Sequence, residues 1–308
     1  MAAAPTATPE RIKDVNTRYH DAAAGEYDAK WGIDLGAVGQ KQVRAKFEKA
    51  LGEWPAPFGD ALEIGAGTGY FTLNLAQLGL IERPTATDIS PGMLAALDAS
   101  AKSVGVEVRT VRTEAETLPF EDASFDLVFG HAVLHHIPDL ERAFGEFERV
   151  LRPGGVLVFC GEPSRYGDTI AAVPKRAAIA AAPLWRTALG AGPRRRAPAA
   201  EENGAGGDHG LEWEVDVHAF APGDLAAMLR GAGFDSVRIR GEELLANMYG
   251  WVLRSLESTA EPEEVPVRWR SFAFRSYLAL QRVDTSLLEP RLPPALFYNL
   301  VLSARKPG

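Results

Sequence analysis

Residues 61–71 read Ala61-Leu62-Glu63-Ile64-Gly65-Ala66-Gly67-Thr68-Gly69-Tyr70-Phe71. A short apolar run enters a turn that has glycine at every second position. The segment that leaves the turn is apolar and has helical spacing at Phe71, Leu75 and Leu78. This order predicts a strand, a glycine turn and a helix, an arrangement that presents backbone N–H groups to a ligand.

The glycine spacing narrows the class of ligand. Gly65 and Gly67 allow backbone torsions and a close approach that a Cβ would block, and Thr68 is expected to cap the helix. A dinucleotide fingerprint requires Gly-x-Gly-x-x-Gly/Ala, but Tyr70 occupies the third small position and Gly69 comes one residue early. The Gly-Lys-Ser/Thr of a phosphate loop is missing from this turn. The pattern therefore indicates a nucleoside without a pyrophosphate and disfavours a nicotinamide dehydrogenase.

The run from Glu63 to Gly69 resembles the first motif of class I S-adenosylmethionine-dependent methyltransferases. A second run, Leu134-His135-His136-Ile137-Pro138-Asp139, resembles the small-molecule, ubiquinone-biosynthesis-like (methyltransferase type 11) group of that family. The resemblance covers about residues 60–240 and the last dozen residues. It implies an α/β fold with a Rossmann-like, mostly parallel sheet of seven strands, in which the seventh strand is antiparallel. It also implies S-adenosyl-L-methionine as the cofactor.

Composition sets the outer limits on function. A chain of 308 residues can bury the core of one large α/β domain with embellishments. Its net charge of −8 argues against a nucleic-acid partner. The single cysteine, Cys160, fits a reducing compartment and is expected to be a core residue. Neither a signal peptide nor a bilayer-spanning apolar run is visible, so a cytoplasmic location is expected.

The chain divides into three kinds of segment. Residues 1–54 carry two helical patterns, around 10–24 and 37–51, and are predicted to cover the cofactor cleft. The methyltransferase core is assigned to 55–163, 216–241 and 294–308. Two insertions, 164–215 and 242–293, leave the sheet at its ligand-binding edge and are predicted to form a helical cap that sets substrate choice. Predicted strands within the core are 85–88, 106–111, 125–129, 156–160, 234–240 and 296–305, and predicted helices are 91–102, 140–151 and 222–230.

The second predicted strand ends at Asp88, about 20 residues after the glycines, where a carboxylate can accept hydrogen bonds from ribose hydroxyls. The resemblance implies that Glu114, with Glu116 as the alternate, meets the adenine amine. It also implies that Tyr27, with Tyr19 second, closes over the methionine end. The full set of expected cofactor-binding residues is Tyr27, Glu63, Gly65, Ala66, Gly67, Asp88, Ile89, Met93, Glu114, Ala115, Glu116, Gly130 and His131.

The candidate catalytic residues are His135 and His136, which follow the fourth strand, and Glu162, which follows the fifth. Histidine is the natural base near neutral pH, and a carboxylate could orient one of the pair. The alternatives are that one histidine packs or caps the next helix, or that no base is needed. Spacing that would suit a metal ion is not evident, so a metal is not indicated.

The expected activity is methyl transfer to a small molecule, with O-methylation of a hydroxyl or phenol favoured. C- or N-methylation of a small or lipid-like acceptor is the close alternative, and a catalytically silent cofactor-binding protein is another. The Asn/Asp-Pro-Pro-Tyr/Phe motif of base and glutamine amine methylation does not follow the fourth strand. A basic patch within residues 175–196 could meet an anionic membrane surface or substrate, and the apolar cap segments could form a homodimer contact. The patch contains Lys175, Arg176, Arg186, Arg194, Arg195 and Arg196.

Overall fold

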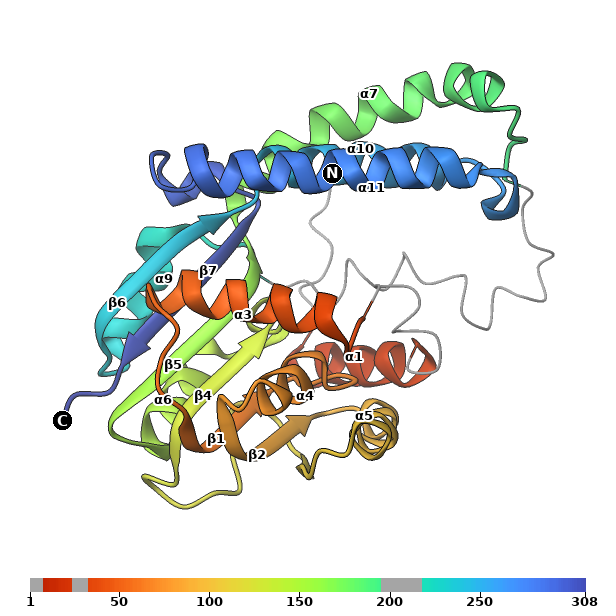
Figure 1. Cartoon of the computed structure of the whole chain (residues 1–308). Coiled ribbons are helices and arrows are strands. Elements are labelled where there is room, and N and C mark those ends of the chain that lie inside the picture. The colour runs from red at the N-terminus through yellow and green to blue at the C-terminus, as the bar shows by residue number, and fades with distance from the viewer. Residues whose placement is uncertain (1–7, 24–32, 195–217) are drawn as a thin grey trace.

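A sheet of seven strands forms the centre of the computed structural model, which describes residues 8–23, 33–194 and 218–308 (Figure 1). The strand order is β3-β2-β1-β4-β5-β7-β6. Neighbouring strands are parallel except β7, which is antiparallel to both β5 and β6. The predicted fold class is therefore confirmed. The strands are β1 Phe58–Ile64, β2 Ile81–Asp88, β3 Arg109–Arg112, β4 Phe125–His131, β5 Leu151–Pro163, β6 Asp235–Glu242 and β7 Asn299–Arg305.

Helices cover both faces of the sheet because alternate strand residues are apolar on each side. Leu157 and Phe159 of β5 pack with α6 and α9, whereas Val156, Val158 and Cys160 pack with α3 and α4. Cys160 is thus a fully buried core residue, as predicted. These helices are α3 Ala37–Leu51, α4 Tyr70–Gln77, α6 Leu140–Val150 and α9 Pro222–Gly231.

Capping residues set the start of helix α5 (Pro91–Val104), as the sequence predicts. The Ser90 hydroxyl accepts a hydrogen bond from the Met93 N–H at 3.0 Å, and Pro91 occupies the first turn. The prediction that Thr68 caps α4 is wrong. The N-cap is Gly69, whose φ of 91° suits glycine and which has no side chain to offer.

All six strands predicted after the glycine turn are found, but their bounds differ from the predicted ones, and the third and fifth strands show why. The third strand is shorter and later than 106–111, because only Arg109–Arg112 pair with β2. Helix α6 ends as predicted, but the Pro153-Gly154-Gly155 break lies within β5 rather than before it. The register shifts there, between the pairs Phe125–Leu151 and Leu127–Val156, so the extra residues form an irregularity in the strand.

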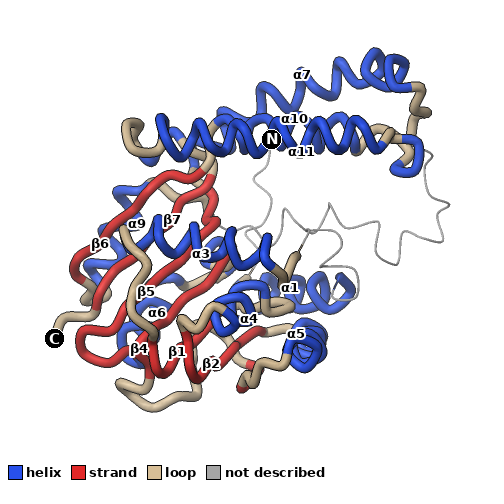
Figure 2. Tube along the Cα trace, in the orientation of Figure 1, coloured by secondary structure: helices blue, strands red, loops and turns tan. Residues whose placement is uncertain are grey.

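Three helices form a separate layer above the β6–β7 side of the sheet (Figures 1 and 2). They are α7 Arg165–Leu189, α10 Leu245–Glu257 and α11 Val267–Val283. Ala178 and Ala182 of α7 pack against Leu256 of α10, and Trp185 of α7 meets Trp269 of α11 at 5.5 Å between ring centroids. Of the helices that the structure describes, none combines the length and the apolar composition needed to cross a bilayer.

The remaining elements are helix α1 and four short turns of helix. Helix α1 (Pro9–Ala23) lies beside α5, where the Asp21 carboxylate accepts a hydrogen bond from the Gly92 N–H at 2.9 Å. The short turns are η1 Leu134–His136, η2 Pro262–Glu264, η3 Asp284–Leu288 and η4 Pro294–Leu296.

Candidate functional site

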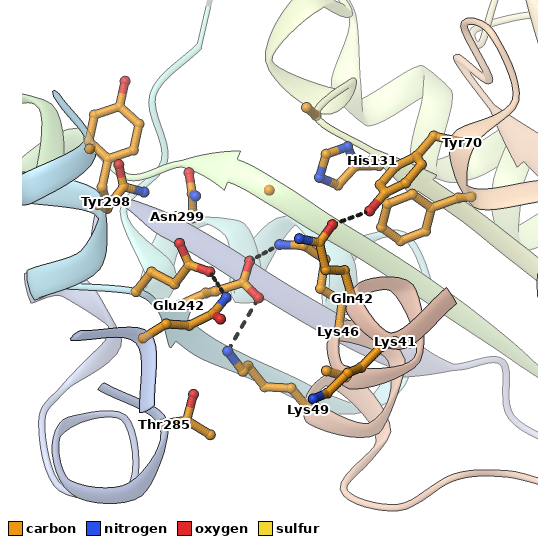
Figure 3. A pocket seen from close by; sticks show the side chains of 18 of the residues that line it. Lys41, Gln42, Lys46, Lys49, Tyr70, His131, Glu242, Thr285, Tyr298 and Asn299 are labelled. Carbon is orange, nitrogen blue, oxygen red and sulfur yellow. Dashed lines mark hydrogen bonds and ion pairs between the residues drawn. The ribbon is translucent and has the colours of Figure 1, made fainter. Parts of the chain in front are cut away.

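A cavity of about 1550 Å³ lies between the glycine turn, the carboxyl ends of β4, β5 and β6, helix α3 and the cap helices α10 and α11 (Figure 3). Its size exceeds what one small ligand needs, since typical ligand pockets are about 300–1,000 Å³. Of the predicted cofactor-binding residues, those that line it are Glu63, Gly65, Ala66, Gly67 and His131. Of the predicted catalytic residues, those that line it are His135 and His136.

The glycine turn has the open shape that a bound nucleoside would need. Gly65 has a φ of 62°, and a Cβ there would come within 2.3 Å of a methyl carbon of Val133. Gly67 has a φ of 53°, and a Cβ there would enter open space. Only glycine adopts these torsions without strain, so the turn can bring its backbone close to a ligand.

Glu63 fastens the turn to helix α4. Its buried carboxylate accepts hydrogen bonds from the Thr72 N–H, at 3.0 Å, and from the Thr72 hydroxyl. It therefore supplies the helix cap that Gly69 cannot. Burial raises the pKa of Glu63 to about 8, and the two hydrogen bonds only partly oppose that rise.

The raised pKa gives a pH-dependent prediction for Glu63→Gln. A carboxyl whose pKa is higher in the folded state than in the unfolded state favours folding below its unfolded pKa. That contribution is lost as pH rises from about 4.5 to about 8. The amide does not titrate, so we expect the variant to gain stability relative to the parent across this window, by up to about 1.4 kcal/mol per pH unit. Urea unfolding at pH 5, 6, 7 and 8 measures the difference. A constant difference would contradict the prediction.

Asp88 lies at the carboxyl end of β2, where the sequence places it. One carboxylate oxygen accepts the Gly67 N–H at 2.9 Å, and the other accepts the Ser90 N–H at 2.9 Å. Burial raises the pKa of Asp88 above its ordinary value. The carboxylate therefore links the glycine turn to the start of α5, and each oxygen retains a lone pair for a ligand.

Helix α1 covers the region where the adenine is expected. The ammonium group of Lys13 lies 2.6 Å from the Glu114 carboxylate and 3.1 Å from that of Glu116.

Two predicted cofactor residues belong to the core of the protein. The side chain of Met93 is fully buried in the protein interior, and Ala115 packs against the α6 side of the core. Three further predicted residues do not line the cavity: Asp88, Ile89 and Gly130. Tyr27 lies outside the described residues, as does the side chain of Tyr19.

Glu162, which is fully buried, holds the turn that carries the tandem histidines and contacts the first of them, His135. Its carboxylate accepts the N–H groups of Val133, Leu134 and His135 at 3.0–3.2 Å. It also lies 2.9 Å from Nδ1 of His135. That carboxylate is the acceptor for three backbone N–H groups, so the His135 tautomer that fits it carries the proton on Nδ1 and leaves Nε2 as the basic nitrogen. The ring of His136 is 3.9 Å from that of His135 and 6.0 Å from that of His20, between centroids.

His131 is unsuited to act as a base. Its ring stacks on Phe71 at a centroid distance of 4.5 Å, and burial lowers its pKa to about 3. His131 is therefore an uncharged side chain that lines the cavity. Next to it, the Tyr70 hydroxyl donates a hydrogen bond to Gln42 at 2.7 Å (Figure 3).

The sequence did not indicate the charged cluster at the cap end of the cavity. Glu242, at the end of β6, pairs with Lys46 and with Lys49, the latter at 3.2 Å (Figure 3). Burial alone would raise the pKa of Glu242, but the two ammonium groups outweigh it and lower the pKa to about 2. Lys49 also meets Glu289 at 2.9 Å. The three pairs are 193, 196 and 240 positions apart along the chain, so no local pattern joins α3 to these carboxylates.

Residues 62–159 match the family model described as a methyltransferase domain. The match spans β1 to β5, including the glycine turn, Asp88 and the tandem histidines. These residues are thus similar to a methyltransferase domain, and the predicted resemblance to the class I S-adenosylmethionine-dependent methyltransferases is confirmed for this part of the chain.

Characterised relatives share this part of the chain. A malonyl-[acyl-carrier protein] O-methyltransferase of Methylovorus sp. is 34% identical over 147 residues, which are 46% of this chain and 48% of the relative. A demethylmenaquinone methyltransferase of Thermus thermophilus is 38% identical over 97 residues, 32% of this chain and 44% of the relative. The chain thus spans about half the length of the relatives that it matches.

Solved structures share the fold. The [4+2]-cyclase SpnF superposes with a TM-score of 0.58 at 18% identity and covers 98% of both chains. Phosphoethanolamine N-methyltransferase 2 of Haemonchus contortus, in complex with S-adenosyl-L-methionine, has a TM-score of 0.58 at 17% identity. That match covers 96% of this chain and 60% of the other. At these identities the likeness concerns the fold alone.

Proposed function

We propose that this protein is an S-adenosyl-L-methionine-dependent methyltransferase that acts on a small-molecule acceptor, with a hydroxyl or phenol oxygen favoured. The observation that carries the proposal is the glycine turn, open at Gly67 and joined to Asp88, at the mouth of a cavity lined by His135. The methyltransferase domain match over residues 62–159 supports it.

The residues present fit the cofactor. The backbone at Gly65 and Gly67 would hold the nucleoside, and Asp88 would accept from its ribose hydroxyls. When bound, this cofactor supplies an electrophilic methyl group on a sulfonium. The chain must then align the acceptor, exclude water and remove a proton from a hydroxyl nucleophile. In this proposal His135 takes the last task, because Glu162 would orient its ring through Nδ1 and would stabilise the imidazolium.

The favoured oxygen acceptor is supported by this His135–Glu162 pair and by relatives named as O-methyltransferases. A nitrogen or carbon acceptor remains the alternative, since other relatives are named N- and C-methyltransferases. A protein that binds the cofactor without transferring its methyl group is a second alternative. The fold permits it, because one structure of similar fold is that of a [4+2]-cyclase.

Isothermal titration with S-adenosylhomocysteine and S-adenosylmethionine tests the proposal. We expect both to bind at one site per chain. Failure of both to bind would refute the enzyme assignment, whereas binding without methyl transfer to any hydroxylated, amine or carbon acceptor in a screen would favour the silent protein.

The outward face of α7 supports the proposed contact with an anionic membrane surface. Val173 and Leu184 there are 70% and 78% exposed. Residues 165–196 contain seven basic side chains and one acidic side chain in a chain of net charge −8, and of these Arg176 is exposed on α7, whereas Lys175 lies over the Trp251 ring at 3.7 Å. Exposed apolar side chains beside lysine and arginine are typical of helices that lie on anionic lipid. A symmetric pair of two such faces would instead bring like charges together.

We therefore expect the protein to sediment with phosphatidylserine-containing vesicles but not with pure phosphatidylcholine vesicles, and to be released by salt. Arg176→Glu should lower the bound fraction roughly tenfold, because each basic residue near such a surface contributes about 1 kcal/mol. The matched control is Lys102→Glu on the exposed end of α5, away from the cap. Equal binding of both variants, or none by the parent, would refute the contact. A concentration-dependent increase in mass would indicate a homodimer at this face.

A further inference from the structure

The inward face of α1 carries a buried polar atom, Oδ1 of Asn16, that has no hydrogen-bond partner among the described residues. Asn16 is 2% exposed, next to Val15 and one turn after Ile12, both also buried. Its Oδ1 is shielded from solvent and has no hydrogen-bond partner in the described part of the chain. A buried acceptor without a donor is costly and rare, and such groups are found where a ligand supplies the donor.

The neighbours of Asn16 on α1 show what it faces. Lys13, three residues before, meets Glu114 and Glu116, which follow β3. His20, four residues after, lines the cavity and interacts electrostatically with Asp88 at the end of β2. Residues spaced by three and four share one face of a helix, so Asn16 lies between these two strand ends.

This position is where an adenosine would place its base if Asp88 held the ribose. The two carboxylates expected to meet the adenine amine, those of Glu114 and Glu116, already accept from the Lys13 ammonium. Those carboxylates keep further lone pairs, whereas Oδ1 of Asn16 is buried and has no donor at all among the described residues. An exocyclic amine is the donor that adenine offers on its Watson–Crick edge.

We propose that Asn16 reads the base of the cofactor, with its Oδ1 accepting a hydrogen bond from the 6-amine of adenine. This inference rests on the proposed function, because it requires a nucleoside on the glycine turn. Since the oxygen is shielded from solvent, α1 has to shift outward as the base enters, and the contact forms as the helix settles back.

The test compares two ligands on two proteins. The ligands are S-adenosylhomocysteine and its analogue in which hydrogen replaces the 6-amine. The parent should bind the first about tenfold more tightly, the usual scale for one buried hydrogen bond. In Asn16→Leu the preference should fall to within about twofold, through weaker binding of S-adenosylhomocysteine. Thermal unfolding of this variant should match or exceed the parent, because a buried unpaired acceptor has been removed.

Two further variants distinguish the effect of Asn16 on base preference from the effects of neighbouring residues. Thr17→Ala is the matched control, because the Thr17 hydroxyl donates to the Lys13 carbonyl of its own helix, and it should keep the full preference. Glu116→Gln should also keep it. A preference that survives in Asn16→Leu, or that is lost in Glu116→Gln, would overturn the inference while leaving the proposed function intact. Absence of S-adenosylhomocysteine binding by the parent would overturn both.

Discussion

Asp88→Ala is expected to weaken S-adenosylhomocysteine binding at least 100-fold. The carboxylate is the acceptor at the end of β2 and would lose two charge-assisted hydrogen bonds to ribose hydroxyls, each worth about 1.5–3 kcal/mol. The same substitution frees the N–H groups of Gly67 and Ser90, so the glycine turn also loses its link to α5. Isothermal titration measures the loss of affinity directly.

A second carboxylate provides the matched control. Asp98 lies two turns further along α5 and accepts a hydrogen bond from Thr110 at 3.2 Å, away from the glycine turn. Asp98→Ala should keep the parent affinity within about twofold. Retention of tight binding by Asp88→Ala would show that the ligand does not reach β2, and the nucleoside assignment of the turn would then fail. Thermal unfolding of both variants separates lost affinity from lost folding.

The strands and helices of the central sheet could be predicted from the sequence because the patterns that specify them are local. The apolar runs of β4 and β5, the glycine turn and the Ser90-Pro91 helix start each act within a few residues. These local rules place Asp88 and His135 at the same edge of the sheet, at the ends of β2 and β4 on either side of β1, once the sheet is parallel. The Thr68 cap failed for a specific reason: Gly69 adopts a positive φ, which delays the helix by one residue.

Long-range pairing is what local patterns cannot supply. Lys46 and Glu242 lie 196 residues apart, and nothing near either residue indicates the other. Likewise, Lys13 reaches Glu114 across 101 residues, so the engagement of that carboxylate could not be foreseen. A signal was available for Asn16, because it is the polar residue in an otherwise apolar stripe that includes Ile12 and Val15.

His135→Ala is expected to lower the turnover number roughly 100-fold, while the affinity for S-adenosylhomocysteine stays within about twofold. The base removes a proton from the acceptor and does not hold the nucleoside, so the loss should fall on turnover alone. His136→Ala should have a smaller effect, because it is the His135 ring that Glu162 orients at 2.9 Å. Initial rates with the acceptor found in the screen, measured at saturating cofactor, give the turnover number, and isothermal titration gives the affinity for S-adenosylhomocysteine.

Glu162→Gln distinguishes two roles for His135: a base that the Glu162 carboxylate orients, or a side chain that only packs in the interior. The substitution keeps the volume but offers an N–H to a site where three backbone N–H groups already donate. We therefore expect a loss of about 1–3 kcal/mol in unfolding free energy together with a fall in turnover as large as that of His135→Ala. In the double variant the turnover loss should not grow, because both substitutions remove one proton-accepting unit. Additive losses, or unchanged rates in both single variants, would show that the reaction proceeds without this base.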